Sequence, residues 1–106
     1  MLRLVFVSML PFASPVWAGT FQDGNSLYEA CSGDELDKTY CVGYITSVAD
    51  IMESDTLYVF KACSLENVTG GQLLDVVTRW LAEHPKDRHH NGTILVAWAL
   101  SEAFPC

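Results

Sequence analysis

Basic residues are scarce in this chain of 106 residues, which contains six Lys and Arg against 13 Asp and Glu. The formal net charge at pH 7 is therefore −7. A surface with this excess of carboxylates repels nucleic acid and anionic membranes, because both are negatively charged, and it favours a basic partner. The charge also has a simpler interpretation, since it keeps a small protein soluble.

Catalytic and cofactor-binding motifs are also missing. No serine lies in a Gly-x-Ser-x-Gly sequence, and there is no Cys-x-x-Cys pair of the kind used for zinc or thioredoxin-like redox chemistry. The pair Gly70-Gly71 lacks the lysine and the strand of a phosphate-binding loop. The three histidines, His84, His89 and His90, lack the paired spacing of common zinc sites. We therefore expect no enzymatic activity, no metal and no cofactor.

Apolar runs are too short to cross a membrane, since a spanning helix needs about 20 apolar residues. The run at the N-terminus, from Leu4 to Phe12, follows the basic residue Arg3 and precedes small residues that end at Ala18. This order is typical of a secretory signal peptide, which residues 1–18 would form. We expect cleavage after Ala18, which leaves residues 19–106 as one exported domain without a membrane segment.

All four cysteines lie in the predicted mature domain, at positions 31, 41, 63 and 106. An even number of cysteines in a small exported chain indicates disulfides, here two. A domain of this size buries only about 60–65% of the surface of its unfolded chain, so covalent cross-links add stability that the core alone does not supply. The last residue, Cys106, would then hold the C-terminal end in place.

Apolar residues recur at helical spacing in four segments, which predicts an all-α, four-helix domain. Thr69 and Gln72 fit a capping box at the start of the third helix, and Pro85 stops that helix. Residues 34–38 are predicted to form a polar connection, and residues 53–68 an irregular segment. The predicted helices cover residues 25–31, 39–52, 69–84 and 90–104.

Two of these helices contain residues that we expect to pack against another element. In the second, Gly43 is unfavourable by about 1 kcal/mol relative to alanine, so either another helix packs closely against it or the glycine is merely tolerated. Asp50 lies on the same face, and we expect it to be buried and bonded to a neighbouring backbone. The fourth helix is apolar almost all round, which predicts either a central helix or a second face that contacts another chain.

Four cysteines allow three pairings. Cys31 and Cys41 flank the connection between the first two helices and would form a short clip. Cys63 and Cys106 would then join the segment before the third helix to the end of the fourth, if the last two helices are antiparallel. The chain-entropy estimate for these two loops is about 2.7 and about 4 kcal/mol.

The order of several short motifs along the chain resembles a known family. Cys41–Ile45 reads C-V-G-Y-I, Val76–Pro85 reads V-V-x-x-W-L-x-x-H-P, and Ala99–Cys106 reads A-L-x-x-A-F-P-C. With N-x-L-x-x-x-C at Asn25–Cys31 and the single Cys63 between them, this order is similar to that of the Rap/Tai family of periplasmic immunity proteins of type VI secretion.

The resemblance implies a small helical protein that often forms a homodimer, binds a peptidoglycan amidase effector in the periplasm and occludes its active-site cleft. Candidate contacts in this chain are Asp55, Tyr58 and Phe60, because aromatic residues among polar neighbours suit an interface. Alternatively, the two aromatic residues pack in the core beneath a loop. Other functions that we consider are a small periplasmic chaperone active in acid stress, which the many carboxylates would suit, and an inhibitor of another cell-wall hydrolase.

Overall fold

The computed structural model describes residues 21–106, and the predicted signal peptide lies outside them. Between residues 21 and 106 the chain contains no β-strand, and its backbone forms helices, turns and two isolated bridges. The predicted all-α fold is therefore confirmed. The elements are α1 (Gly24–Cys31), α2 (Glu35–Ser54), α3 (Gly70–Glu83), the short 3-10 helix η1 (Pro85–Asp87) and α4 (Gly92–Ala103).

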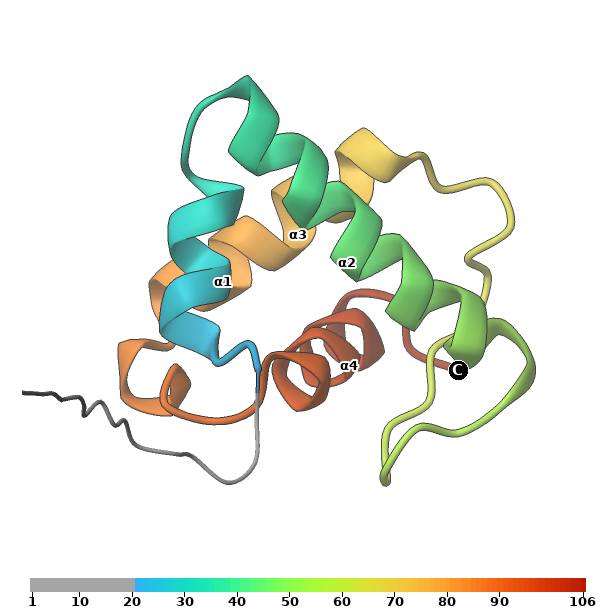
Figure 1. The fold of residues 1–106 in the computed structure, drawn as a ribbon. Coiled ribbons are helices and arrows are strands. Elements are labelled where there is room, and N and C mark those ends of the chain that lie inside the picture. Colours follow the sequence, from blue (N-terminus) through green and yellow to red (C-terminus); the bar gives the residue numbers. More distant parts are fainter. Residues whose placement is uncertain (1–20) are drawn as a thin grey trace, which may run out of the picture.

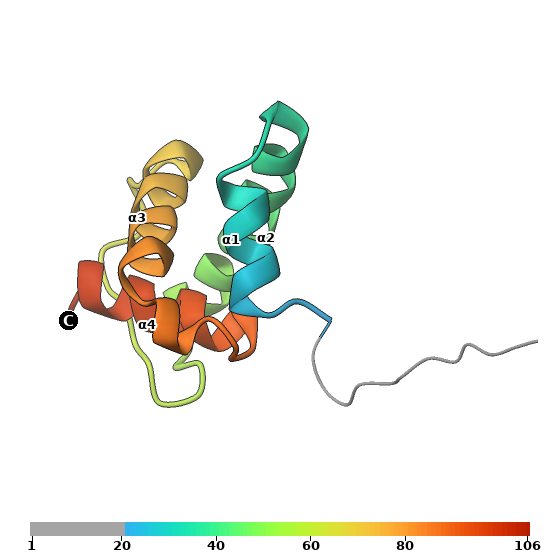
Figure 2. The ribbon, with the colours of Figure 1, turned by 90° about the vertical axis from the view of Figure 1, so that its left-hand side faces the viewer.

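Helix α4 is the centre of the domain. Figure 2 shows α1, α2 and α3 upright and α4 lying across their lower ends, and α4 contacts each of the other three helices (Figures 1 and 2). This position explains why α4 is apolar almost all round and confirms its interpretation as a central helix. The antiparallel arrangement predicted for the last two helices is wrong, because α4 crosses α3 steeply. Buried side chains of α4 are Leu95, Val96, Ala97, Ala99 and Leu100.

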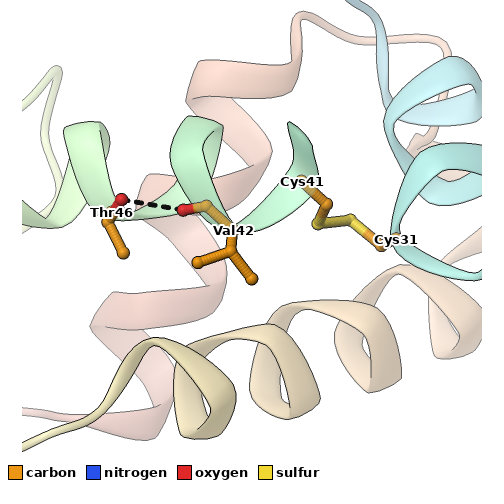
Figure 3. Close-up of a disulfide and its surroundings, with 4 residues drawn as sticks. All are labelled: Cys31, Cys41, Val42 and Thr46. Carbon is orange, nitrogen blue, oxygen red and sulfur yellow. Dashed lines mark hydrogen bonds between the residues drawn. A yellow bond between two sulfur atoms is a disulfide. The ribbon is translucent and has the colours of Figure 1, made fainter. Parts of the chain in front are cut away.

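Both predicted disulfides are present. Cys31–Cys41 joins the end of α1 to α2 and lies in the core, where its cysteines are 1% and 0% exposed (Figure 3). Cys63–Cys106 joins the segment before α3 to the C-terminal residue. It forms although α3 and α4 are not antiparallel, because the segment around Cys63 runs beside the end of α4, where the Cys63 N–H donates to the Phe104 carbonyl at 2.9 Å.

Local capping explains where the helices begin. The third helix starts with the predicted capping box, in which the Thr69 side chain accepts from the Gln72 N–H and the Gln72 side chain accepts from the Thr69 N–H. The second helix begins at Glu35 rather than residue 39, because Asp34 caps it by accepting from the Asp37 N–H at 3.0 Å. Residues 34–38 are thus a helix start, in which carboxylates face the positive end of the helix dipole, and the predicted polar connection is wrong.

Of the two alternatives for Gly43, the close helix contact is wrong and the tolerated glycine agrees with the structure, whereas the predicted burial of Asp50 is wrong. A side chain at Gly43 would meet nothing within 4 Å, so no other helix packs on it, and Asp50 is exposed rather than buried. The glycine that permits close contact between α2 and α3 is Gly70, where an added Cβ would lie 3.1 Å from the Val42 side chain. In Figure 3 the Val42 side chain points away from the α2 axis toward α3.

Candidate partner-binding surface

A tight turn projects from the segment between α2 and α3. Leu57 and Phe60 exchange two backbone hydrogen bonds of 3.0 and 2.9 Å, which leaves Tyr58 and Val59 as the two central residues of the turn. The rest of this segment is irregular, as predicted, except that residues 53 and 54 complete α2. We call residues 57–60 the tip turn.

The tip turn is built from residues that do not favour it. Tyr58 has φ 58°, in the left-handed region where glycine and asparagine are preferred, at a strain of about 1 kcal/mol for a bulky residue. Two-residue turns with a positive φ at the first central residue alone usually have glycine at that position. Here the side chains of Tyr58 and Val59 are instead 53% and 86% exposed. The turn therefore presents apolar surface to solvent at a position where polar turn residues would be more stable.

Aromatic stacking fixes the base of the tip turn. Phe60 is half-buried and stacks on Trp98, with ring centroids 5.9 Å apart and planes inclined by 16°. Trp98 contacts Trp80, and the ring of His84 stacks on Trp80 at 3.8 Å. The predicted alternative of core packing therefore describes Phe60, which anchors the turn, whereas Tyr58 points into solvent.

Polar contacts hold this aromatic cluster in one arrangement. The two indole N–H groups of Trp80 and Trp98 donate to the two carboxylate oxygens of Glu102, each at 2.9 Å. The Nδ1 of His84 lies 2.7 Å from the Trp80 carbonyl oxygen, to which it donates. Since the Cys63–Cys106 disulfide fixes the chain three residues after Phe60, the tip turn stands on a rigid base.

The third predicted contact, Asp55, lies at the end of α2 rather than in the turn. Its N–H donates to the Ile51 carbonyl at 3.0 Å and its carboxylate is exposed. It lines an open hollow of about 610 Å³ between the end of α2 and residues 61–66. Glu53 and Glu66 also line this hollow, against the single cation Lys61, so its charge favours a basic group.

Sequence reasoning missed an exposed apolar row on the outer side of α2. Leu36, Tyr40 and Ile51 are 79%, 52% and 47% exposed; the first two are one turn apart and Ile51 lies on the same face about three turns farther on. The signal is the same three-to-four spacing that predicted the core stripe. It was hidden because the predicted helix began after Leu36. Val59 was missed because it follows Tyr58 in a turn that the sequence does not predict.

Tyr44 links the edge of this row to α4. Its hydroxyl lies 2.9 Å from the Thr93 hydroxyl at the start of α4. Burial raises the pKa of Tyr44, so the phenol is neutral at physiological pH. The phenols of Tyr40 and Tyr58 raise the pKa further, by less than burial does.

Metal ligands do not converge in the part of the chain that the structure describes. No group of three or more His, Cys, Asp and Glu there is placed to hold an ion. His84 belongs to the aromatic cluster, while the rings of His89 and His90 lie against each other at 4.0 Å. Among residues 21–106, none of the helices combines the length and the apolarity that a membrane crossing requires.

These features define a small helical domain stapled by disulfides, whose exposed apolar residues suit contact with another protein. The family model for Rap1a immunity proteins matches residues 23–106, and the chain therefore belongs to this family. It is an immunity protein against a secreted effector, which it binds as its protein partner, and proteins of this family are generally non-catalytic. A search of curated proteins gave no match.

Proposed function

We propose that the chain is a periplasmic immunity protein that binds a peptidoglycan amidase effector of type VI secretion and occludes its active-site cleft. Membership of the Rap1a family supports the immunity function. Residues 1–18, which we predict to be a signal peptide cleaved after Ala18, support export, and two disulfides suit an oxidising compartment. The motif resemblance to the Rap/Tai proteins supports an amidase as the target.

The tip turn is the observation that carries the proposal of occlusion. An enzyme cleft is blocked most directly by a narrow, rigid projection that enters it. Tyr58 and Val59 lie at the end of such a projection, and their exposed side chains are the apolar anchors that protein interfaces use. Because Phe60 and the Cys63–Cys106 disulfide hold the turn before binding, little conformational entropy is lost when the complex forms.

Asp55 and Phe60 have different roles in this proposal. Asp55, with Glu53 and Glu66, forms an acidic rim that contacts basic residues of the effector and increases the rate of association. Phe60 contacts Trp98 and positions the turn without entering the cleft. The homodimer implied by the family resemblance remains a prediction, and the buried residues of α4 would not take part in it.

Co-expression in the periplasm tests the proposed function. A candidate amidase effector is expressed in the periplasm with the wild-type chain, with a Tyr58→Asn/Val59→Gly variant, or with an Asp75→Ala control on the exposed side of α3. We expect the wild type and the control to prevent lysis and to co-purify with the amidase, and the turn variant to fail. If the wild type neither binds an amidase nor prevents lysis, the proposed function is wrong.

A further inference from the structure

Helix α2 has a second apolar face that the domain leaves uncovered. Its core side includes Ile45 and Met52, which are 0% and 2% exposed. Leu36, Tyr40 and Ile51 form the outer row described above. Single exposed apolar residues are common on soluble proteins, but three on one face of the same helix, Leu36 and Tyr40 one turn apart and Ile51 about three turns farther on, indicate an interaction surface.

The middle of this row is open to close approach by another chain. Gly43 and Ser47 lie between the large residues, and a side chain at Gly43 would meet nothing within 4 Å. The Ser47 hydroxyl is turned back to donate to the Tyr44 carbonyl at 2.8 Å. Glycine lowers the stability of an exposed helix interior relative to alanine. No contact within the domain requires Gly43, so its surface is free for a contact with another chain.

The charges around the row indicate which partner fits. Within α2 and its two caps only Lys38 is basic, and a second copy of this chain would bring two such acidic helices together without compensation. A basic surface would instead be attracted to the rim of the row. The carboxylates of α2 and its caps are Asp34, Glu35, Asp37, Asp50, Glu53 and Asp55.

We propose that the outer face of α2, formed by Leu36, Tyr40, Gly43, Ser47 and Ile51, is a second docking surface for the effector, and that it takes a basic segment with apolar side chains at its centre. The inference rests on the proposed function. It adds a second surface that binds the effector, besides the tip turn. The tip turn begins at Leu57, three residues after α2 ends at Ser54, so the turn lies next to the C-terminal end of this helix. One effector can therefore contact both.

A larger side chain at position 43 should weaken binding of the effector without lowering the stability of the domain. The probe is a purified amidase effector of type VI secretion, inactivated at its catalytic residue, and calorimetry measures its Kd for the full mature chain. We expect Gly43→Gln to weaken binding at least tenfold while the thermal midpoint stays unchanged or rises, because glutamine is the better helix former. A double variant, Leu36→Ala/Tyr40→Ala, should weaken binding to a similar extent.

Matched charge variants test the chemistry of the partner. Glu35→Gln/Asp50→Asn removes two charges from the rim of α2, and Asp75→Asn/Glu83→Gln removes two from α3. We expect the association rate to fall several-fold more for the α2 pair at low salt, and the difference to shrink at high salt.

Each outcome decides between the two proposals. If Gly43→Gln binds the effector like the wild type while the Tyr58→Asn/Val59→Gly variant does not, the α2 surface is wrong and the proposed function stands. If the wild-type chain is a dimer that Gly43→Gln converts to a monomer, a second copy occupies this face and the inference is overturned. If the wild type binds no amidase effector, both proposals fall.

Discussion

Removal of the Cys63–Cys106 disulfide should affect effector binding far more than removal of Cys31–Cys41, although both variants lose similar stability. The bonds span 43 and 10 residues of sequence, which corresponds to about 4 and about 2.7 kcal/mol in the chain-entropy estimate. Loss of the bond that closes the shorter loop nevertheless lowers the free energy of unfolding by a similar amount, because its two cysteines are buried and Cys→Ala substitutions there also remove core contacts. We therefore expect each double Cys→Ala variant to lose about 3–4 kcal/mol.

The two disulfides should differ in their effect on effector affinity because they fix different parts of the chain. Cys63–Cys106 fixes the chain that leaves the tip turn against the end of α4, whereas Cys31–Cys41 fixes α1 to α2. Without Cys63–Cys106 the turn must be ordered during binding, and the affinity should fall at least tenfold, whereas the Cys31/Cys41 variant should stay within a few-fold of the wild type.

Urea unfolding and calorimetric titration with an amidase effector, both at low temperature, test this prediction. Circular dichroism on the same samples gives the folded fraction, by which each apparent Kd is corrected. Equal affinities of the two variants after that correction, or a larger loss in the Cys31/Cys41 variant, would show that the turn does not need its covalent anchor.

Three further predictions concern stability. Gly24→Ala should lower the free energy of unfolding by about 1–3 kcal/mol, because an added Cβ would lie 2.7 Å from the Arg88 carbonyl oxygen; a variant as stable as the wild type in urea would show that this backbone contact yields easily. Tyr44→Phe should lose about 1 kcal/mol at pH 7 with its hydrogen bond to Thr93. Because the pKa of Tyr44 is raised in the folded state, the neutral phenol stabilises the fold below pH 10, and this contribution is lost as the pH rises through the folded pKa. The free energy of unfolding should therefore change less between pH 7 and 11 in the Phe variant than in the wild type. Parallel pH profiles would show that Tyr44 does not have a raised pKa. Tyr58→Asn should raise the thermal midpoint by roughly 4–8 °C, since asparagine adopts positive φ more readily; a lower midpoint would mean that Tyr58 packs rather than projects.

The capping of one helix, the burial of another and the disulfide pairing were predicted correctly from the sequence. The capping box at Thr69 and Gln72 predicted the start of α3, because both halves of the motif act within four residues. The composition of α4 predicted its burial, since an all-apolar helix has to be covered. The pairing of Cys63 with Cys106 was also correct, although the antiparallel helices on which it was based were not found.

Features set by tertiary structure were not readable. The crossing of α4 over α3 depends on which ridges interdigitate, and a helical period does not encode that choice. The start of α2 was missed because Asp34 and its acidic neighbours resemble a polar loop as much as a capped helix end. The positive φ of Tyr58 had no signal at all, since Tyr-Val is not a turn sequence.

Inhibition of a purified amidase effector tests the central claim most directly. Peptidoglycan cleavage is measured while the mature chain is added, and the Tyr58→Asn/Val59→Gly variant is titrated beside it. The account predicts that cleavage stops when one chain is present per amidase, and that the variant inhibits at least tenfold more weakly. A complex that forms at full strength while the amidase continues to cleave would contradict occlusion by the tip turn.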